Sequence, residues 1–275
     1  MCLRDPLVTT TAPGTPGRRS MWIGALLAVA LAGLIAWVVG HHGRPLSWDL
    51  ALHAAALQHR SPALTNAAIV VTTTGEVPAY VVAALGGLLA LRPRRWWGGA
   101  LAGVALLGAG QLLRLGLAIG IGRARPPSSE WAWPASGFAL PSGHTTTASL
   151  AAGLLCLGLA RGLRGVRRAV GVTLAACWAA AVGVTRVYLG VHWPTDVLAG
   201  WLLGGLLTVL ASQLLLSRPL GRAAVGAEGP APQHQGGRLE DGDVALADQV
   251  GDQTVGDQAG RGEPRGGEEQ PEPAG

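Results

Sequence analysis

Six long apolar segments, separated by short clusters of arginine, constrain this chain more than any other feature. They cover residues 21–40, 66–91, 96–119, 145–160, 169–188 and 195–216. A membrane core about 30 Å thick is crossed by a helix of roughly 20 apolar residues. Only 13% of the 275 residues are charged, whereas soluble domains carry roughly 25%. The pattern predicts an all-α, polytopic membrane protein with six transmembrane helices, and it excludes an ordinary water-soluble fold.

Two of the six segments need an interpretation of their own. The second contains a polar run from Thr72 to Glu76 and then Pro78, so we expect a kink or a hydrated outer half. The first follows Arg18-Arg19, which leaves two readings, a retained anchor or a cleaved signal peptide. Its length, and the lack of a small-x-small cleavage site directly after it, favour the anchor.

Arginine supplies all 21 basic residues, and its distribution sets the expected orientation. With the N-terminus in the cytoplasm, the cytoplasmic segments hold 12 arginines and the outer loops hold 5. Because cytoplasmic loops are enriched in basic residues, we expect a multi-pass protein of the cell membrane with both termini in the cytoplasm. Short arginine clusters between apolar segments do not form the basic face of a nucleic-acid-binding domain, so no nucleic-acid partner is expected.

Composition divides the chain into three parts. Residues 1–20 form a cytoplasmic N-terminal segment, and residues 21–217 form the membrane domain. Residues 218–275 are rich in Gly, Pro, Gln and Asp, and 11 of the 16 acidic residues lie beyond residue 220. Such a segment buries too little apolar surface to fold, so we predict a disordered, acidic cytoplasmic tail. The absence of lysine and the abundance of Ala, Gly and Arg favour a GC-rich bacterial source.

Three polar stretches lie at the same, outer ends of successive apolar segments. They are Gly122–Pro127, Pro141–His144 and Thr185–Asp196. Together they supply Arg123, Arg125 and Arg186, a Ser142-Gly143 turn at the start of a helix, two histidines and one carboxylate. Forked guanidinium donors match phosphate oxygens, and a helix N-terminus offers free N–H groups to an anion. The three stretches therefore predict a phosphate site on the extracytoplasmic face.

The two histidines suggest the chemistry of this site. His192 and Asp196 are spaced i,i+4, so they can meet on one face of a helix or of the turn that leads into it. A carboxylate bound to one ring nitrogen fixes the tautomer and leaves the other nitrogen free to attack phosphorus. With His144 as a general acid, this is the minimum for cleaving a phosphate ester without a metal. The three cysteines show neither a disulfide pattern nor a zinc-site spacing.

These stretches resemble the motifs of the type 2 phosphatidic acid phosphatase (PAP2) superfamily of membrane lipid phosphatases. That family's pattern is Lys-x6-Arg-Pro, then Pro-Ser-Gly-His, then Ser-Arg-x5-His-x3-Asp. The matches are Arg125-Pro126, Pro141-Ser142-Gly143-His144 and Thr185-Arg186-x5-His192-x3-Asp196. The resemblance covers roughly residues 21–216 and implies a PAP2-like bundle of six helices with an external site.

The resemblance also implies a role for each matched residue. His192 attacks the phosphorus atom and forms a phosphohistidine, with Asp196 orienting the ring. His144 protonates the leaving group and then helps a water molecule attack the intermediate. The phosphoryl oxygens are held by Arg125, Arg186, Ser142 and the Gly143 N–H, with Arg123 at a further basic position. Neither a metal nor another cofactor is required.

One departure from the family pattern concerns the first motif. The position of the family lysine, seven residues before Arg125, is occupied by Ala118. Arg114 lies one helical turn earlier on the same face, and its long side chain could reach outward to the phosphate. We therefore hypothesise that Arg114 replaces the missing lysine. The alternative is that Arg114 pairs with Glu76, which also lies in the outer part of its segment.

The leading hypothesis is hydrolysis of a lipid phosphate or diphosphate at the outer face of the membrane. Prenyl diphosphate, phosphatidic acid and phosphatidylglycerol phosphate are the classes considered, and the sequence does not choose among them. The lipid bilayer and its phosphorylated lipid are then the partners, and no protein partner is predicted. Phosphoryl transfer to an alcohol, or a non-catalytic lipid binder or transporter, are the alternatives. A vanadate-dependent haloperoxidase has a similar motif set, but six spans argue against that soluble class.

Overall fold

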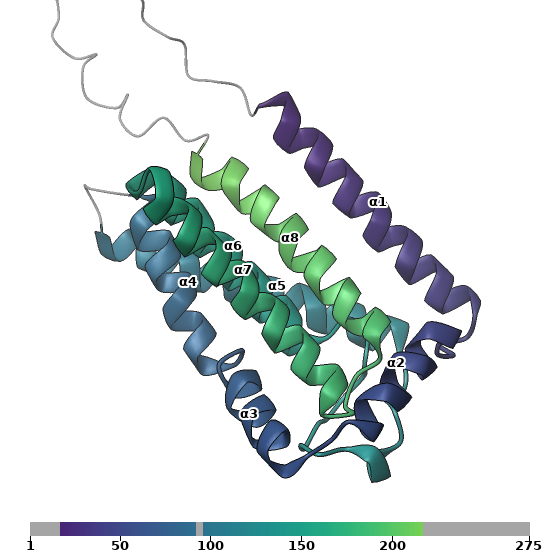
Figure 1. Ribbon diagram of the computed structural model, residues 1–275. Helices are drawn as coiled ribbons and strands as arrows, with labels where there is room; N and C mark the ends of the chain where they lie inside the picture. Colours follow the sequence, from purple (N-terminus) through teal and green to yellow (C-terminus); the bar gives the residue numbers. More distant parts are fainter. Residues whose placement is uncertain (1–16, 92–95, 217–275) are drawn as a thin grey trace, which may run out of the picture. The chain divides into compact units, whose positions relative to one another are not determined.

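The computed structural model describes residues 17–91 and 96–216, so the predicted tail and nearly all of residues 1–20 lie outside the described part. All the regular elements within those two ranges are helical, as predicted (Figure 1). They are α1 (Arg18–Gly40), α2 (Ser47–Gln58), α3 (Pro62–Thr73), α4 (Val77–Ala90), α5 (Trp96–Ile121), the 3-10 turn η1 (Ser128–Glu130), α6 (Gly143–Gly162), α7 (Gly165–Tyr188) and α8 (Pro194–Leu216).

Four of these helices are long and apolar enough to cross a membrane: α1, α5, α7 and α8. The pair α3 and α4 passes the same test only if it is taken as one bent span, which would be the fifth. The predicted count of six is therefore not confirmed in the described ranges. The other long helix, α6, has the polar run His144–Thr147 in its first turns and packs against α4, α5, α7 and α8. A helix enclosed by its neighbours does not need an apolar face toward lipid.

The kink predicted in the second apolar segment is confirmed. Helix α3 ends at Thr73 and α4 begins at Val77, with a bend of 47° between them. Pro78 has no N–H group and cannot extend the hydrogen-bond ladder back into α3. At the end of α3, the hydroxyls of Thr73 and Thr74 donate to the carbonyl oxygens of Val70 and Val71. The break places Glu76 beside the start of α6, where it contacts His144.

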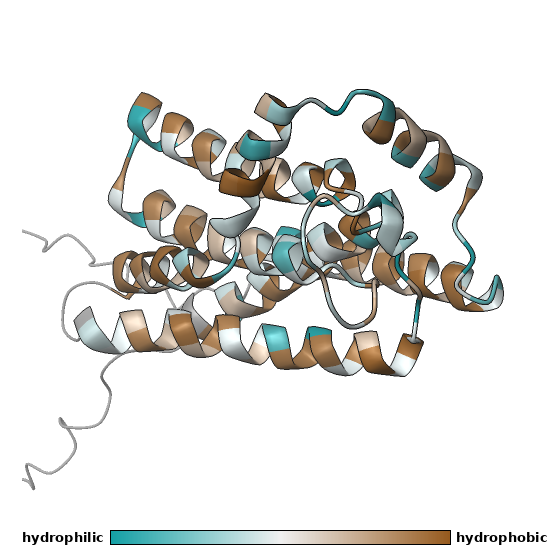
Figure 2. Ribbon diagram, turned by 90° about the horizontal axis from the view of Figure 1, so that it is seen from below, coloured by the Kyte–Doolittle hydropathy of each residue, from teal (hydrophilic) through white to brown (hydrophobic). Residues whose placement is uncertain are grey.

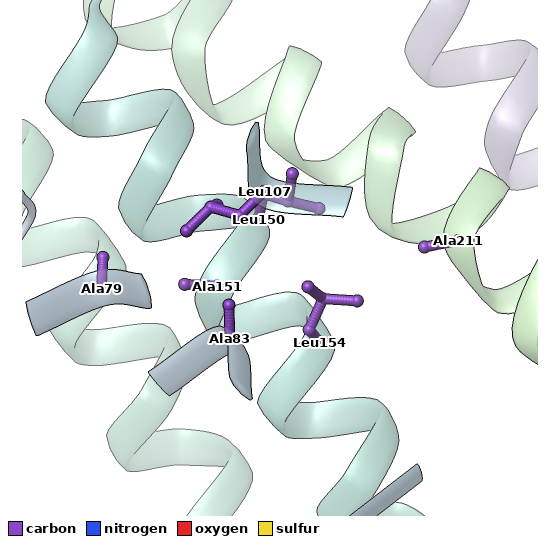
Figure 3. Close-up of a cluster of buried hydrophobic side chains, with 7 residues drawn as sticks. All are labelled: Ala79, Ala83, Leu107, Leu150, Ala151, Leu154 and Ala211. Carbon is purple, nitrogen blue, oxygen red and sulfur yellow. The ribbon is translucent and has the colours of Figure 1, made fainter. Parts of the chain in front are cut away.

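Small residues bring α4 and α5 into close contact. A Cβ atom at Gly99 of α5 would lie 2.6 Å from the carbonyl oxygen of Gly87 in α4, and one at Gly103 would collide with the backbone of Ala83. Close backbone approach through small residues is a common way to join helices within a membrane. Next to this contact lies a buried cluster of alanines and leucines from α4, α5, α6 and α8: Ala79, Ala83, Leu107, Leu150, Ala151, Leu154 and Ala211 (Figure 3).

The outward surface of the long helices is also apolar. Leu26 of α1, Leu112 of α5 and Leu174 of α7 each expose 65–72% of their surface. Hydrophobic residues dominate the long helices, and hydrophilic ones gather in the connections between them (Figure 2). A soluble monomer rarely exposes so much continuous apolar surface. The helices therefore belong to a protein that spans a membrane several times.

Two glycines within the polar stretches lie just after the ends of helices. Gly122 follows α5 with φ +66°, and Gly190 follows α7 with φ +76°. Residues other than glycine rarely adopt these positive φ values. Each turn stops a span and sends the chain across the end of the bundle, so that Arg123, Arg125 and His192 lie on loops near the starts of α6 and α8.

Candidate active site

The structure brings all three polar stretches together at one end of the bundle. Arg125 of the first stretch donates from Nη1 to Nε2 of His192 in the third, over 2.8 Å. The backbone N–H of Ser142 in the second stretch donates to the carbonyl oxygen of Asp196, over 3.0 Å. The three stretches are separated in sequence, so they meet because α5, α6, α7 and α8 pack together, as the sequence predicts.

The hydrogen bond from Arg125 fixes the protonation pattern of His192. A guanidinium can only donate, so Nε2 of His192 accepts and carries no proton, which places the proton of the neutral ring on Nδ1. Nε2 is therefore the nitrogen with an available electron pair. The remaining donors of Arg125 are bound to the backbone oxygens of Ser136, Gly137, Phe138 and Val191.

Asp196 lies on the other side of the His192 ring, as the i,i+4 spacing predicts. Its Oδ2 is 3.5 Å from Nδ1 of His192. This distance gives electrostatic attraction but exceeds that of a good hydrogen bond. The same oxygen accepts the N–H of Trp193 over 2.9 Å, which fixes the carboxylate at the first turn of α8. Asp196 and His192 are both almost completely buried.

Arg123 is placed differently from Arg125. Its side chain is fully buried, and it forms ion pairs with Asp49 at 3.0 Å and with Asp196 at 2.5 Å. Its Nη1 also donates to Oγ1 of Thr195, and its Nε to the carbonyl oxygen of Gly43. All three nitrogens thus have protein acceptors. This arrangement favours a supporting role for Arg123 over the predicted contact with phosphate.

His144 stands at the start of α6, and its Nε2 is 2.7 Å from Oε1 of Glu76. The His144 side chain is 20% exposed and that of Glu76 is 49% exposed, so the pair borders the open side of the site. His144 also interacts electrostatically with Arg125 and Arg186. Among the described side chains Glu76 forms no ion pair with Arg114, contrary to the alternative that the sequence left open.

Arg114 extends from α5 toward the same helix start. A Cβ atom at Gly143 would lie 3.3 Å from Cζ of Arg114, so the guanidinium rests directly against the Gly143 backbone. Arg114 is also close enough to Arg125 for their charges to repel. By contrast, Ala118 is buried and carries no charge. The structure therefore places a cation beside the second motif, and that cation comes from position 114.

Arg186, in the last turn of α7, is 2% exposed. Its Nη1 donates to Oγ1 of Thr72 over 3.0 Å. Within the described part of the chain, its Nε is buried without a hydrogen-bond partner, and so is Nε of Arg114. No carboxylate in that part forms a salt bridge with Arg114, Arg125 or Arg186. Cations withdrawn from water need a counter-charge, so these three can bind an anion next to His192.

Ser142 and Gly143 form the start of α6 against α8. The hydroxyl of Ser142 accepts from Oγ1 of Thr145 over 3.0 Å, and a hydroxyl that accepts one bond can still donate its own proton. Gly200 of α8 allows this close approach, because a Cβ atom there would lie 2.8 Å from Cβ of Thr145. The contact holds the second motif directly against the helix that carries Asp196.

The charges around His192 also determine its protonation. Burial, followed by the positive charges of Arg125 and Arg186, lowers the pKa of His192 well below its ordinary value of 6.5. A group with a lowered pKa loses its proton at a lower pH, so His192 is neutral at pH 7. The ring nitrogen that faces Arg125 is therefore available as a nucleophile under physiological conditions.

We predict a corresponding pH dependence. The neutral ring of His192 is the reactive form, so the acid limb of kcat/KM that reports His192 should lie well below pH 6.5. Replacing Arg125 by Gln removes a positive neighbour, which raises the pKa of His192 and moves the acid limb toward pH 6.5. Titration of kcat/KM for both proteins with one substrate checks this, because the ionisation of the substrate is common to both. Coincident acid limbs would contradict it.

Sequence reasoning missed Asp49 and Glu76 as members of the site. Only four acidic residues lie in the described part of the chain, and all four contact a histidine or an arginine at this end of the bundle. They are Asp49, Glu76, Glu130 and Asp196. The scarcity of acids in an apolar chain was the available signal, because a carboxylate there is costly unless it is paired.

These observations define the class of protein. It is a multi-pass helical membrane protein with a histidine, a carboxylate and three guanidinium groups gathered at one end of its bundle, and none of these three forms a salt bridge with another described residue. Residues 97–219 match the model of the PAP2 superfamily. Phosphatidylglycerophosphatase B of Bacillus subtilis (strain 168) is 32% identical over 176 residues, which are 62% of this chain and 84% of that protein. The chain belongs to the PAP2 superfamily, so the family predicted from the motifs is confirmed.

Two further comparisons agree. The crystal structure of a transmembrane PAP2 type phosphatidylglycerolphosphate phosphatase from Bacillus subtilis matches with a TM-score of 0.60 and 29% identity, covering 70% of this chain and 96% of that one. An undecaprenyl-diphosphatase of Sulfolobus acidocaldarius is 36% identical over 85 residues, which are 30% of this chain and 36% of that relative. The names of these relatives agree with the predicted class of enzyme, a phosphatase.

Proposed function

We propose that the protein hydrolyses a lipid phosphate or diphosphate through a phosphohistidine intermediate on His192. The observation that carries this proposal is a group of three guanidiniums, Arg114, Arg125 and Arg186, none of which forms a salt bridge within the described ranges. Arg125 and Arg186 lie close enough to act on both His144 and His192, and Arg114 lies against Gly143. A phosphoryl group supplies the missing negative charge and also the electrophile. Preorganised donors of this kind stabilise the charge that develops on phosphoryl oxygens.

In the first step, Nε2 of His192 attacks phosphorus, and the bond from phosphorus to the ester or bridging oxygen breaks. Arg125 turns its Nη1 donor from His192 to a phosphoryl oxygen, which frees the electron pair on Nε2. Asp196 draws closer to Nδ1 as the ring becomes cationic, since catalytic hydrogen bonds are often long before substrate binds. His144, held at Nε2 by Glu76, takes up a proton at Nδ1 when the anionic phosphate binds beside it and offsets the charges of Arg125 and Arg186, and it donates this proton to the leaving oxygen.

In the second step, a water molecule attacks the phosphorus atom of the phosphohistidine. His144 is now neutral and takes a proton from this water, so that the residue acts first as an acid and then as a base. The bond between phosphorus and Nε2 breaks, which returns the electron pair to His192. Inorganic phosphate leaves, and Arg125 can again donate to Nε2.

The membrane arrangement that fits this chemistry has six spans, as the sequence predicts. In it, α6 is a sixth span enclosed by its neighbours, and the bent pair α3 and α4 is one span with its break at the level of the site. The arginine bias supports cytoplasmic termini and an extracytoplasmic site. Residues 21–217 then form the catalytic domain, and residues 218–275 form a cytoplasmic tail.

Two substrate classes have direct support from the relatives. The names of the bacterial and archaeal proteins point to phosphatidylglycerol phosphate and to undecaprenyl diphosphate. Both carry a terminal phosphate on a lipid, and that phosphate is the only part that the described cations recognise. Phosphatidic acid presents the same group and belongs to the same test.

The proposal is tested by measuring phosphate release in detergent micelles with EDTA present. The panel contains a prenyl diphosphate, phosphatidic acid and phosphatidylglycerol phosphate. We expect metal-independent release from at least one of them, and the ranking identifies the preferred lipid. Folded protein that releases phosphate from none of them would contradict hydrolysis. Release that requires an added alcohol would instead indicate a phosphoryl transferase.

Arg114 is proposed to replace the family lysine at Ala118, and a pair of variants tests this. Arg114→Met keeps an unbranched side chain but removes its charge, so kcat/KM should fall by about 10²- to 10³-fold, as for loss of one donor to a developing anion. Arg114→Lys restores a cation of the kind that the family uses and should stay within about threefold of the wild type. Equal activity of Arg114→Met and the wild type would contradict the replacement.

A further inference from the structure

We propose that Asp49, on the outer helix α2, is a positioning residue that sets the charge and orientation of Asp196 through Arg123. Asp49 lies 143 positions before His192, and no family motif includes it. The assignment rests on the proposed function, because its effect is exerted on His192. The structure joins the residues in one buried chain: Asp49, Arg123, Asp196 and His192.

Asp49 is completely buried and has four hydrogen-bond donors. Its Oδ2 accepts from Nη2 of Arg123 over 3.0 Å, from Oγ1 of Thr195 over 2.8 Å and from the N–H of Leu46 over 3.1 Å. Its Oδ1 accepts the N–H of Thr195 over 2.8 Å. A carboxylate with this many donors has only one available position. Asp49 therefore gives Arg123 a fixed, charged point of attachment.

Arg123 transmits this position to Asp196 because the guanidinium is planar and rigid. Nη2 is bound to Asp49, and Nη1 is bound to Asp196 and to Thr195. Thr195 closes the arrangement, because its hydroxyl accepts from Arg123 and donates to Asp49. The carboxylate of Asp196 is thereby held from one side by Arg123 and from the other by the N–H of Trp193.

The charge of this cluster suits the chemistry at His192. With both carboxylates ionised, the two of them and one guanidinium leave a surplus of one negative charge, buried directly behind the imidazole. When Nε2 binds phosphorus the ring becomes cationic, and the surplus charge compensates it. Without the charge of Asp49, Arg123 and Asp196 would neutralise each other. The cationic ring would then lose the counter-charge that stabilises it in a site poor in water.

A purely structural role for Asp49 can be separated from this one, because α2 has a second attachment. His53 of α2 is 5% exposed, and its Nε2 is 2.7 Å from Oε2 of Glu130 in η1. That pair also fastens α2 to the outer loops, but it is not part of the chain of charges that ends at His192. Glu130→Gln is therefore the matched control for Asp49→Asn, since each removes one carboxylate charge from an attachment of α2.

The test is a single-turnover experiment with the full-length protein in excess over a short-chain prenyl diphosphate. At saturating protein, its rate constant is a property of the active molecules, and a misfolded fraction raises only the total protein concentration needed to saturate the substrate. For Asp49→Asn we expect the rate constant to fall by about 10- to 100-fold, the loss seen in metalloenzymes when a residue that orients a metal ligand is removed. The concentration of folded protein that gives half-saturation should not change. For Glu130→Gln we expect the wild-type rate constant and a lower midpoint of thermal unfolding.

A wild-type rate constant for Asp49→Asn, with or without a rise in the total protein concentration needed to saturate the substrate, would overturn the proposal, and so would an equal slowing in Glu130→Gln. If Asp49→Asn yields no folded protein, Thr195→Val provides the second test. It removes the hydroxyl that joins Asp49 to Arg123 but keeps both charges, and we expect a loss of about 3- to 10-fold. A wild-type rate constant for Thr195→Val would then overturn it. If the wild type does not hydrolyse the prenyl diphosphate, the lipid of the panel that it hydrolyses fastest takes its place, and failure with every lipid of that panel would contradict the proposed function instead.

Discussion

Replacing His192 by Ala is expected to lower phosphate release by about 10⁴-fold or more, the largest effect of any single change in this protein. Nε2 of His192 is the proposed nucleophile, and loss of a nucleophile from a covalent mechanism removes nearly all of the chemical acceleration. Arg125 and Arg186 would remain in place, so lipid phosphate should still bind. We therefore expect kcat to fall and the affinity for a non-hydrolysable phosphonate lipid to stay within a few-fold.

His53→Ala is the matched control for that experiment. His53 is another buried histidine near the site, with its ring centroid 5.1 Å from that of Trp193, but it is not proposed to touch phosphate. We expect its loss to lower the thermal midpoint and leave kcat within about threefold, because it contributes packing and one ion pair. Turnover by His192→Ala at more than a few per cent of the wild-type rate would exclude His192 as the nucleophile.

Replacing His144 by Ala is expected to have the second largest effect, and the effect should depend on the leaving group. For a lipid phosphate, the departing alkoxide needs a proton, and loss of a general acid costs about 10²- to 10⁴-fold. An aryl phosphate such as 4-nitrophenyl phosphate releases a stable phenolate that needs no proton. The first step should therefore survive in the variant when this substrate is used.

The second step distinguishes this account further, because His144 also activates the water molecule. In His144→Ala, 4-nitrophenyl phosphate should give a rapid burst of one phenolate per active site, followed by slow turnover as phosphohistidine accumulates. Lipid phosphate should give no burst. Equal losses with both substrates, or the absence of a burst from the aryl ester, would show that His144 has another role, such as binding the phosphoryl group.

The sequence predicted the helical class, the break in the second apolar segment and the residues that meet at the site. These features follow from local rules: run length, the missing N–H of Pro78, and the placement of motifs at successive span ends. The six-span count is not confirmed, because hydropathy detects helices that face lipid and not helices that are enclosed by other helices. The enclosed helix α6 can have His144 and three threonines in its first turns without contacting lipid at those positions.

Partner choice was harder to predict than membership of the site. Arg123 and Arg125 are two positions apart, yet one is enclosed by Asp49 and Asp196 and the other contacts His192. Spacing along a loop does not specify the direction of a guanidinium, because the acceptors come from distant elements. The same holds for Glu76, whose partner His144 is 68 positions away. These contacts are set by how α2, α4, α6 and α8 pack, which local patterns do not encode.

The most direct test of the central claim is to trap the covalent intermediate. The enzyme, supplied with its best lipid substrate and EDTA, is quenched in alkali during turnover, because phosphohistidine is stable to base and labile to acid. Peptides are then sequenced by mass spectrometry. We predict one phosphoryl group on His192, lost on acidification, and more abundant in His144→Ala when 4-nitrophenyl phosphate replaces the lipid. Steady phosphate release with no phosphoryl group on His192, or with the group on Ser142 or His144, would contradict the proposed mechanism.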